Sequence, residues 1–320
     1  MTQPVCKQAS KIGGWGHTLP TRVVDNNHFA SYLETSDEWI SSRTGIKERR
    51  WAEPEETASS LAEQACLNAI KTAGITPADI DGIIVATVTP DYQFPSTACF
   101  LQKRLGCPQG LAFDVNAVCS GFMYALATAD GLLRSKRATK MLVVGVDLYS
   151  RIINPNDRSS CILFGDGAGA IVLEATEVAD SDSGTASGVI HIELGSDAET
   201  LSQGKHFLKM EGREVFRLAV RKLNEVSDSV LQATGYSVED VDYVVSHQAN
   251  KRILDAMAKH MNIPESKVLC NIENVGNTSA ASIPILLSES LDSGVINTGD
   301  LVMLSAFGGG VTWAAGLVRI

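Results

Sequence analysis

An internal duplication constrains the fold of this chain more than any other feature of its sequence. Residues 73–84 read AGITPADIDGII and residues 234–245 read TGYSVEDVDYVV, and the two segments align without a gap. A helical pattern precedes each segment, and a short apolar strand ends it, at residues 83–86 and 243–246. The chain therefore contains the same structural unit twice.

The two copies continue to match in the same order further along the chain. The matching pairs are the helices ending near Gly106 and Asn262, each followed by a proline, and the segments 114–121 with 271–278, 141–147 with 301–307 and 164–174 with 307–318. Strands that alternate with helices predict crossovers between parallel strands, and the last two strands of each copy can add an antiparallel edge. We expect an α/β fold of duplicated halves, with mixed sheets layered with helices.

Composition sets the boundary between these halves. The segment at about 176–205 is rich in Asp, Ser, Gly and Thr, as is typical of a junction, so the predicted halves are 1–178 and 179–320. Residues about 25–56 have no counterpart in the second half and are predicted to be an insertion.

Composition also excludes several classes of function. The formal net charge of −10 disfavours nucleic acid as a partner. No apolar run is long enough to cross a bilayer, and residues 1–11 lack the apolar stretch of a secretory signal, so we expect a cytoplasmic protein without a membrane partner. The seven cysteines are scattered and include no CxxC pair, which argues against a disulfide framework or a zinc site, and no metal is expected.

Cys119 is the best candidate for a nucleophile. It directly precedes a helix predicted over 120–133, where unpaired N–H groups and the helix dipole stabilise a thiolate. Its neighbours Ser120 and Gly121 are small enough to let a bulky substrate approach. A buried structural cysteine is the common alternative. The position at a duplicated strand-to-helix junction favours the nucleophile.

His247 and Asn277 are predicted to join Cys119. His247 follows an apolar strand and precedes a helix predicted over 251–261, whereas Asn277 lies at a junction equivalent to that of Cys119. Taken alone, the histidine could be a hydrogen-bonded residue at a strand end and the asparagine a turn or cap residue. Together they permit a mechanism in which the cysteine attacks one thioester, while histidine and asparagine donate hydrogen bonds to a second thioester as it becomes an enolate.

Two glycine-rich segments need a different interpretation. Residues 165–169 resemble a dinucleotide-binding loop, but they precede a strand-like segment at 170–173 and not a helix. The glycines at 308–310 also precede a strand. Both runs are predicted to let the backbone come close to the site. The N–H of Gly309 would then join that of Cys119 as a donor to an oxyanion.

At these positions the sequence resembles the β-ketoacyl-acyl carrier protein synthase III family, the initiating condensing enzymes of bacterial fatty-acid synthesis. The motifs that carry the resemblance are TSDEWI…RTGI (35–46), DVNAVCSGF (114–122), FGDGAGA (164–170), HQAN-R (247–252), GNTSAAS (276–282) and AFGGG-TW (306–313). The third member of the catalytic set is the discriminator. Elongating condensing enzymes have a Cys–His–His set, and thiolases use a second cysteine. This chain has Asn277 as the third residue, as the initiating enzymes do.

The resemblance implies a thiolase-like fold, a homodimer, and an acyltransferase that needs no cofactor. It also implies a ping-pong reaction that initiates fatty-acid synthesis. A short acyl-CoA, with acetyl-CoA as the expected primer, acylates Cys119. Malonyl-acyl carrier protein then binds, loses CO₂ and attacks, and 3-oxoacyl-acyl carrier protein leaves.

The insertion acquires a role from the same resemblance. Thr35-x-x-Glu38 reads as a capping box that starts a short helix and places Trp39 and Arg43 on one face. The resemblance implies that Trp39 and Arg158 sandwich the adenine of coenzyme A, with Arg43 and Thr35 nearby. The alternative is that Trp39 only anchors the insertion to the core.

Two further surfaces follow from the resemblance. Phe94 matches the aromatic residue that lines the acyl pocket and reaches across the dimer. Basic residues on the helix predicted over 211–231 and on the next helix match the docking positions for the carrier protein: Arg217, Arg252 and Lys259. A solvated basic stripe is the alternative for these three. The inward face of the first helix is predicted to hold Val215, Ala219, Leu223, Val226 and Val230.

Three other functions remain open from the sequence alone. The chain could be a condensing enzyme for a secondary metabolite or for long acyl chains, a non-catalytic scaffold, or a thioesterase that uses His247 as a base toward water. A scaffold does not need the three polar residues, and a thioesterase leaves Asn277 and the insertion without a purpose.

Overall fold

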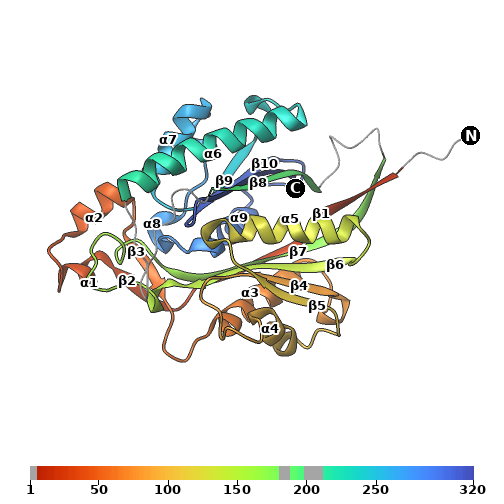
Figure 1. Ribbon diagram of the computed structural model, residues 1–320, viewed down its shortest axis with the longest axis horizontal. Helices are drawn as coiled ribbons and strands as arrows, with labels where there is room; N and C mark the ends of the chain where they lie inside the picture. Colours follow the sequence, from red (N-terminus) through yellow and green to blue (C-terminus); the bar gives the residue numbers. More distant parts are fainter. Residues whose placement is uncertain (1–5, 180–187, 198–211) are drawn as a thin grey trace, which may run out of the picture.

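The structure is a computed structural model, and the residues described are 6–179, 188–197 and 212–320. Two sheets enclose a pair of helices, α5 (Gly121–Arg134) and α9 (Ser282–Asp292), and further helices cover the outer face of each sheet (Figure 1). Helices α3 (Ala58–Thr72) and α4 (Thr97–Leu105) cover one sheet. Helices α6 (Gly212–Thr234) and α7 (Lys251–Met261) cover the other.

The first sheet contains the strands β1 (Cys6–Thr18), β7 (Asp166–Ala179), β6 (Lys140–Leu148), β4 (Gly82–Ala86) and β5 (Leu111–Val115), in that order. Strand β4 runs parallel to both of its neighbours, and β7 runs antiparallel to both of its own. The prediction of a mixed sheet is confirmed. The last strand of this half, β7, is antiparallel to β6, as expected, but β1 and not β7 lies at the edge of the sheet.

The second sheet repeats this plan with the strands β8 (Gly188–Ser196), β11 (Thr312–Arg319), β10 (Leu301–Gly308) and β9 (Tyr243–Ser246). A single bridge between Val244 and Val268 stands where the first sheet has β5. The prediction of a junction at about 176–205 is wrong for residues 176–179, which belong to β7, and for 188–196, where the residues of β8 pair with β11. Residues 180–187 and 198–205 lie outside the described residues.

Equivalent side chains perform the same task in the two copies. The Oδ2 of Asp81 accepts a hydrogen bond from the N–H of Thr139, and the Oδ2 of Asp242 accepts one from the N–H of Leu301, each at 2.8 Å. A capping box with an aspartate at its third position starts the short helix after each duplicated glycine. The duplication is therefore visible in individual hydrogen bonds.

The structure corrects one register in the sequence alignment of the copies. Short turns precede the two central helices, η2 (Val118–Ser120) before α5 and η7 (Ser279–Ala281) before α9. The first residue of each turn has a positive φ, 50° at Val118 and 52° at Ser279. Cys119 thus matches Ala280 and not Gly276, because the helix α8 (Ile272–Val275) adds one turn of chain to the second copy.

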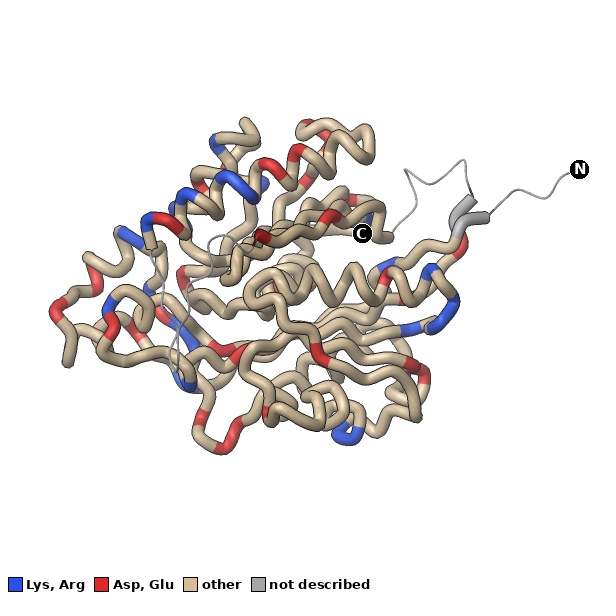
Figure 2. The backbone as a smooth tube through the Cα atoms, viewed as in Figure 1, with Lys and Arg blue, Asp and Glu red and all other residues tan. Residues whose placement is uncertain are grey.

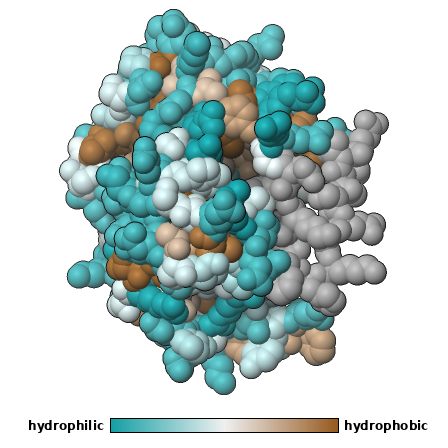
Figure 3. Space-filling model, turned by 90° about the vertical axis from the view of Figure 1, so that its left-hand side faces the viewer, coloured by the Kyte–Doolittle hydropathy of each residue, from teal (hydrophilic) through white to brown (hydrophobic). Residues whose placement is uncertain are grey.

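Strand β2 (Arg22–Asp25) begins just before the insertion predicted at about 25–56 and pairs with β3 (Glu48–Trp51) inside it. The insertion also contains α1 (Asn26–Ala30) and α2 (Asp37–Thr44). The buried guanidinium of Arg49 ties it to the core by donating to Asn26 Oδ1 at 2.9 Å and to the carbonyl of Ile162 at 2.5 Å. Seen from the side of α2, the surface is mainly hydrophilic, with small scattered hydrophobic patches (Figure 3).

The predicted capping box at the start of α2 is wrong. The N-cap is Ser36, whose hydroxyl accepts a hydrogen bond from the N–H of Trp39 at 3.1 Å. Thr35 lies one residue earlier, so its hydroxyl does not cap the helix. Among the described residues, no helix is long and apolar enough to span a membrane.

Candidate active site

Cys119 lies in the turn η2, immediately before α5, with its side chain half-buried. The hydroxyl of Ser279 donates to its sulfur at 3.5 Å. The end of β10 packs closely against this turn. A Cβ on Gly308 would lie 2.9 Å from the carbonyl of Ala117 and 3.1 Å from the nitrogen of Cys119. The predicted close approach of the glycine run is therefore confirmed at Gly308.

Burial raises the pKa of the Cys119 thiol to about 12. The Ser279 hydroxyl and the backbone N–H groups of Cys119 and Gly309 donate toward the sulfur and oppose this shift, whereas the charge of Asp147 adds to it. Backbone N–H groups therefore favour the thiolate, as predicted, but the loss of water outweighs them and the net shift of the pKa is upward. The helix α5 itself begins only at Gly121.

His247 follows β9 and is buried with its backbone fixed. Its N–H donates to the carbonyl of Ser305 at 2.7 Å, and its Nδ1 lies 2.7 Å from the hydroxyl oxygen of Ser282. Burial lowers the pKa of His247 to about 3, so the ring is uncharged at neutral pH. Within the described part of the chain, no hydrogen bond is made by Nε2, which leaves this nitrogen for a ligand.

Asn277 is held by its backbone against the segment before β7. Its N–H donates to the carbonyl of Leu163 at 2.9 Å, and its carbonyl accepts from the N–H of Gly165 at 3.0 Å. A Cβ on Gly165 would lie 2.3 Å from the carbonyl of Val275, so only glycine allows this approach. The side-chain Oδ1 accepts a hydrogen bond from the N–H of Ser279 at 2.9 Å.

Ser279 connects the three predicted catalytic residues, and sequence reasoning missed it. Its hydroxyl reaches Cys119, its N–H reaches Asn277, and its carbonyl accepts from the hydroxyl of Ser282 at 2.8 Å, which in turn contacts His247. Because Ser279 has a positive φ, its hydroxyl, N–H and carbonyl can point toward three different partners within one turn. Two hydroxyl residues beside Asn277 in GNTSAAS were the available signal.

Asp147 is a second residue that sequence reasoning missed. It is the next-to-last residue of β6 and is fully buried. Its Oδ1 accepts from the N–H of Val88 at 2.8 Å, and its Oδ2 accepts from the N–H of Ala280 at 3.2 Å. Burial raises the pKa of Asp147 to about 6. The carboxyl group therefore joins the first half to the turn η7 of the second.

The four residues predicted to bind coenzyme A lie together on and beside α2. The guanidinium carbons of Arg43 and Arg158 lie 4.4 Å and 4.7 Å from the centre of the Trp39 ring. The hydroxyl of Thr35 is buried without a hydrogen-bond partner among the described residues. The side chain of Asn250 donates to the carbonyl of Arg43 at 3.2 Å, which ties α2 to the start of α7 and to the neighbourhood of His247.

Comparisons with known proteins agree on one family. Residues 113–198 match the family model of 3-oxoacyl-[acyl-carrier-protein] synthase III, and residues 231–320 match the model of its C-terminal part. The β-ketoacyl-[acyl-carrier-protein] synthase III of Chelativorans sp. is 49% identical and covers 97% of this chain and 99% of that protein. The chain belongs to the β-ketoacyl-[acyl-carrier-protein] synthase III family.

Solved structures extend this result. The synthase III of Aquifex aeolicus is 43% identical with a TM-score of 0.92, covering 97% of this chain and all, 100%, of that one. The priming β-ketosynthase of the R1128 polyketide pathway also has a TM-score of 0.92 but is 32% identical, covering 100% and 98%. The thiolase-like fold and the assignment as an acyl-transferring condensing enzyme of fatty-acid synthesis are confirmed. A non-catalytic scaffold is excluded.

The remaining predicted site residues lie on the surface. Phe94 is 84% exposed and lies in the loop between β4 and α4. Arg217, Arg252 and Lys259 are exposed on α6 and α7, and no ion pair involves them within the described residues. The inward face predicted for α6 is confirmed, since Ala219, Leu223, Val226 and Val230 are buried and Val215 is partly buried (Figure 2 shows the charged residues of this helix).

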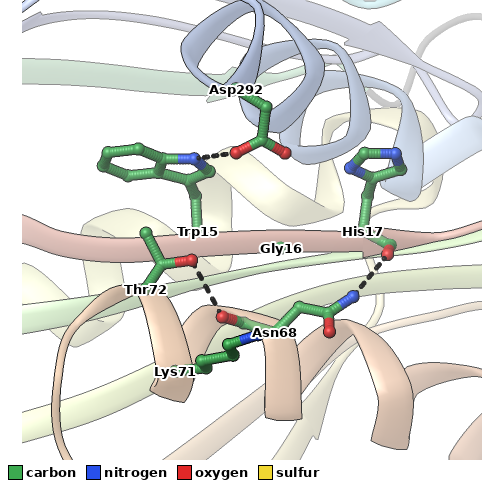
Figure 4. A pocket seen from close by; sticks show the side chains of 7 residues that line it. All are labelled: Trp15, Gly16, His17, Asn68, Lys71, Thr72 and Asp292. Carbon is green, nitrogen blue, oxygen red and sulfur yellow. Dashed lines mark hydrogen bonds between the residues drawn. The ribbon is translucent and has the colours of Figure 1, made fainter.

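The protein also has surface cavities away from these residues. One has a volume of about 300 Å³ and lies between β1, α3 and the end of α9, where the indole N–H of Trp15 donates to Asp292 at 2.8 Å (Figure 4). A second, of about 460 Å³, lies beside β2 and is lined by Arg22, His28 and Glu48. Neither is lined by Cys119, His247 or Asn277, so the active site is identified by its hydrogen bonds and not by cavity size.

Proposed function

We propose that this protein catalyses the decarboxylative condensation of a short acyl-CoA with malonyl-acyl carrier protein, through an acyl group on Cys119. The products are 3-oxoacyl-acyl carrier protein, CoA and CO₂, and no cofactor takes part. The observation that carries the proposal is the turn η7, where one residue, Ser279, hydrogen-bonds to Cys119 and Asn277 and, through Ser282, to His247.

In the first half-reaction the thiol of Cys119 attacks the carbonyl carbon of acyl-CoA. The thiol is the resting form, because its pKa is raised to about 12, so its proton leaves as the new C–S bond forms. The N–H groups of Cys119 and Gly309, which point toward the sulfur, hold the oxyanion. The C–S bond to CoA then breaks, and the CoA sulfur leaves with a proton.

In the second half-reaction His247 and Asn277 act on the malonyl thioester. The Nε2 of His247 and the amide NH₂ of Asn277 donate hydrogen bonds to its carbonyl oxygen, and the carboxylate leaves as CO₂. The carbanion then attacks the acyl carbon on Cys119, and the sulfur leaves and regains a proton. A neutral histidine suits this step, because the charge that develops on the enolate is stabilised by donors.

The insertion is proposed to bind coenzyme A. A nucleotide is polar, and the face that holds α2 is mainly hydrophilic (Figure 3). Adenine would stack on the Trp39 ring with the Arg158 guanidinium on its other side, so Arg158 must move away from its present distance of 4.7 Å. Arg43 and Thr35 would contact the remainder of the nucleotide.

A homodimer is proposed through the free edge of the first sheet. Strand β5 is an edge strand, and Leu111 on it and Phe94 beside it expose apolar side chains. In such a dimer Phe94 would leave water and close the partner's acyl pocket. The carrier protein would dock on Arg217, Arg252 and Lys259, which are exposed cations on α6 and α7.

The proposed reaction is tested with purified protein, acetyl-CoA and malonyl-acyl carrier protein. Intact mass spectrometry should show one acetyl group on the unmutated protein and none on C119A. Release of CO₂ and formation of the 3-oxoacyl carrier should require both substrates. Hydrolysis of acetyl-CoA without condensation would instead support a thioesterase.

A further inference from the structure

Among the described residues, the Nδ1 of His247 contacts only the hydroxyl of Ser282, and this contact influences which ring nitrogen carries the proton. The two atoms lie 2.7 Å apart, and both residues are buried, with 3% and 2% of their surfaces exposed. Because the ring is uncharged, it carries a single proton, on Nδ1 or on Nε2. The partner of Nδ1 therefore decides whether Nε2 accepts or donates a hydrogen bond.

A hydroxyl is an uncharged side-chain group that can serve both states with one atom. It can accept from Nδ1–H, or it can donate to an unprotonated Nδ1. A backbone carbonyl in its place would fix the proton on Nδ1, and a backbone N–H would fix it on Nε2. The hydroxyl of Ser282 is therefore compatible with a ring that changes its role.

The surroundings of Ser282 keep both states satisfied. Its hydroxyl donates to the carbonyl of Ser279 at 2.8 Å, which leaves its lone pair for Nδ1–H. When the hydroxyl turns to donate to Nδ1, the carbonyl of Ser279 still accepts a hydrogen bond from the N–H of Ser282. Neither state leaves a buried donor or acceptor without a partner, which would cost about 1–3 kcal/mol.

We propose that Ser282 is a positioning residue whose hydroxyl lets His247 present a lone pair at Nε2 in the free enzyme and an N–H at Nε2 during condensation. The change is neutral in charge, since the ring loses the Nδ1 proton and gains one at Nε2 by exchange with solvent between the half-reactions. The inference rests on the proposed function, because it assumes that Nε2 donates to the malonyl thioester.

The kinetic test compares S282A, which removes the partner of Nδ1, with S282T, which keeps a hydroxyl. S290A is the matched control, because Ser290 is a buried serine on the same helix that donates only to the carbonyl of Leu286. We expect S282A to accept the acetyl group from acetyl-CoA at close to the normal rate. Its kcat for condensation should fall by about 10–100-fold with little change in KM, and S282T should restore it.

The spectroscopic test reads the proton directly. In ¹⁵N-labelled protein, with the His247 signals assigned by comparison with H247N, the free enzyme should show Nδ1–H. The Cys119-acetylated enzyme should gain the Nε2–H signal when a malonyl-carrier analogue that cannot lose CO₂ is added, and S282A should not show this change. The same tautomer in both states, or unimpaired condensation by S282A, overturns the inference.

Failure of the underlying reaction is distinguishable from failure of this inference. If the unmutated protein is not acetylated on Cys119 or releases no CO₂, the proposed function itself is wrong. If it does both while S282A matches S290A in every rate, only the role of Ser282 is wrong.

Discussion

The side-chain oxygen of Asn277 accepts a hydrogen bond from the backbone N–H of Ser279 at 2.9 Å. This N–H fixes the orientation of the Asn277 side-chain amide, because the amide oxygen can accept a hydrogen bond and the NH₂ group cannot. The NH₂ end therefore points away from the turn and has no acceptor in the described part of the chain. Asn277 is presented as a donor, which is the role that an enolate oxygen requires.

N277D keeps the shape and the accepting oxygen but replaces the donor with a negative charge. We expect acetylation of Cys119 to persist, while CO₂ release from malonyl-acyl carrier protein falls by at least about a hundredfold, as for the loss of one oxyanion donor. Radiolabelled CO₂ release measures the second step separately. N277A is the comparison that removes the donor without adding charge, and it should be less severe. Normal CO₂ release by N277D would contradict the donor role.

The free thiol of Cys119 should react slowly with iodoacetamide at neutral pH. Since burial raises its pKa to about 12, the rate should still be rising above pH 9, with no plateau at lower pH. S279A should slow the reaction further, because it removes a donor to the sulfur at 3.5 Å. Labelling at Cys119, followed by peptide mass spectrometry across a pH series, measures this. A plateau near pH 7 would indicate a stabilised thiolate and contradict the structure.

The stability of the fold should depend on pH through His247. Its folded pKa is about 3 and its ordinary value is 6.5, so below pH 6.5 the unfolded chain takes up a proton that the folded chain refuses. This part of the stability is fully present above pH 6.5 and is lost as pH falls toward 3. At pH 5 the loss should be about 2 kcal/mol relative to H247N. Urea unfolding of both proteins at pH 8 and pH 5 measures it, and parallel curves would refute it.

Gly308 should tolerate no side chain. In G308A the new Cβ would lie 2.7 Å from the Thr312 hydroxyl oxygen and 2.9 Å from the carbonyl of Ala117, which forces the turn with Cys119 to move. We expect acetylation of Cys119 to fall by at least about tenfold, since misplacement by 1 Å can cost more. G309A is the matched control, because its Cβ would lie 3.7 Å from the nearest atom. Equal rates for the two variants would count against the proposed close packing.

Reversing two exposed charges should weaken carrier binding. R252E with K259E should raise the apparent KM for malonyl-acyl carrier protein severalfold and flatten its dependence on salt, because the attraction between charged surfaces is screened by ions. Acetylation by acetyl-CoA measures the first half-reaction as an internal reference. The matched control is R221E, since Arg221 is already paired with Glu225 at 3.8 Å. An unchanged KM and salt slope would leave the basic residues as a solvated face.

The sequence predicts regular elements well where both copies carry the same pattern. The strand at Tyr243–Ser246 and the helix at Lys251–Met261 have the predicted bounds. The copies diverge before α9, where helix α8 has no counterpart, and there the alignment of Cys119 is wrong. A four-residue helix is too short to show a helical pattern in the sequence. Only the backbone therefore reveals that the alignment of the two copies shifts here.

The site is predictable in its reactive residues and not in their supports. Cys119, His247 and Asn277 are distinctive residue types at junctions, whereas Ser279 and Ser282 belong to a type that is common in turns. Their importance arises from a positive φ and from hydrogen bonds that cross between segments. The effect of burial is equally hard to predict from the sequence. The raised pKa of Cys119 depends on the removal of water by residues distant in sequence, which no local pattern contains.

The match of Cys119 with Ala280 has a consequence for how such a site can originate. Two identical copies of one half, associated about a twofold axis, would have to carry the same residue at both turns. Two thiols would then face each other across the axis, and neither turn could specialise. Joining the halves in one chain removes this symmetry. One turn retains sulfur, while in the other the small side chain of Ala280 leaves room for its N–H to reach Asp147, and asymmetry becomes the condition for two different half-reactions in one place.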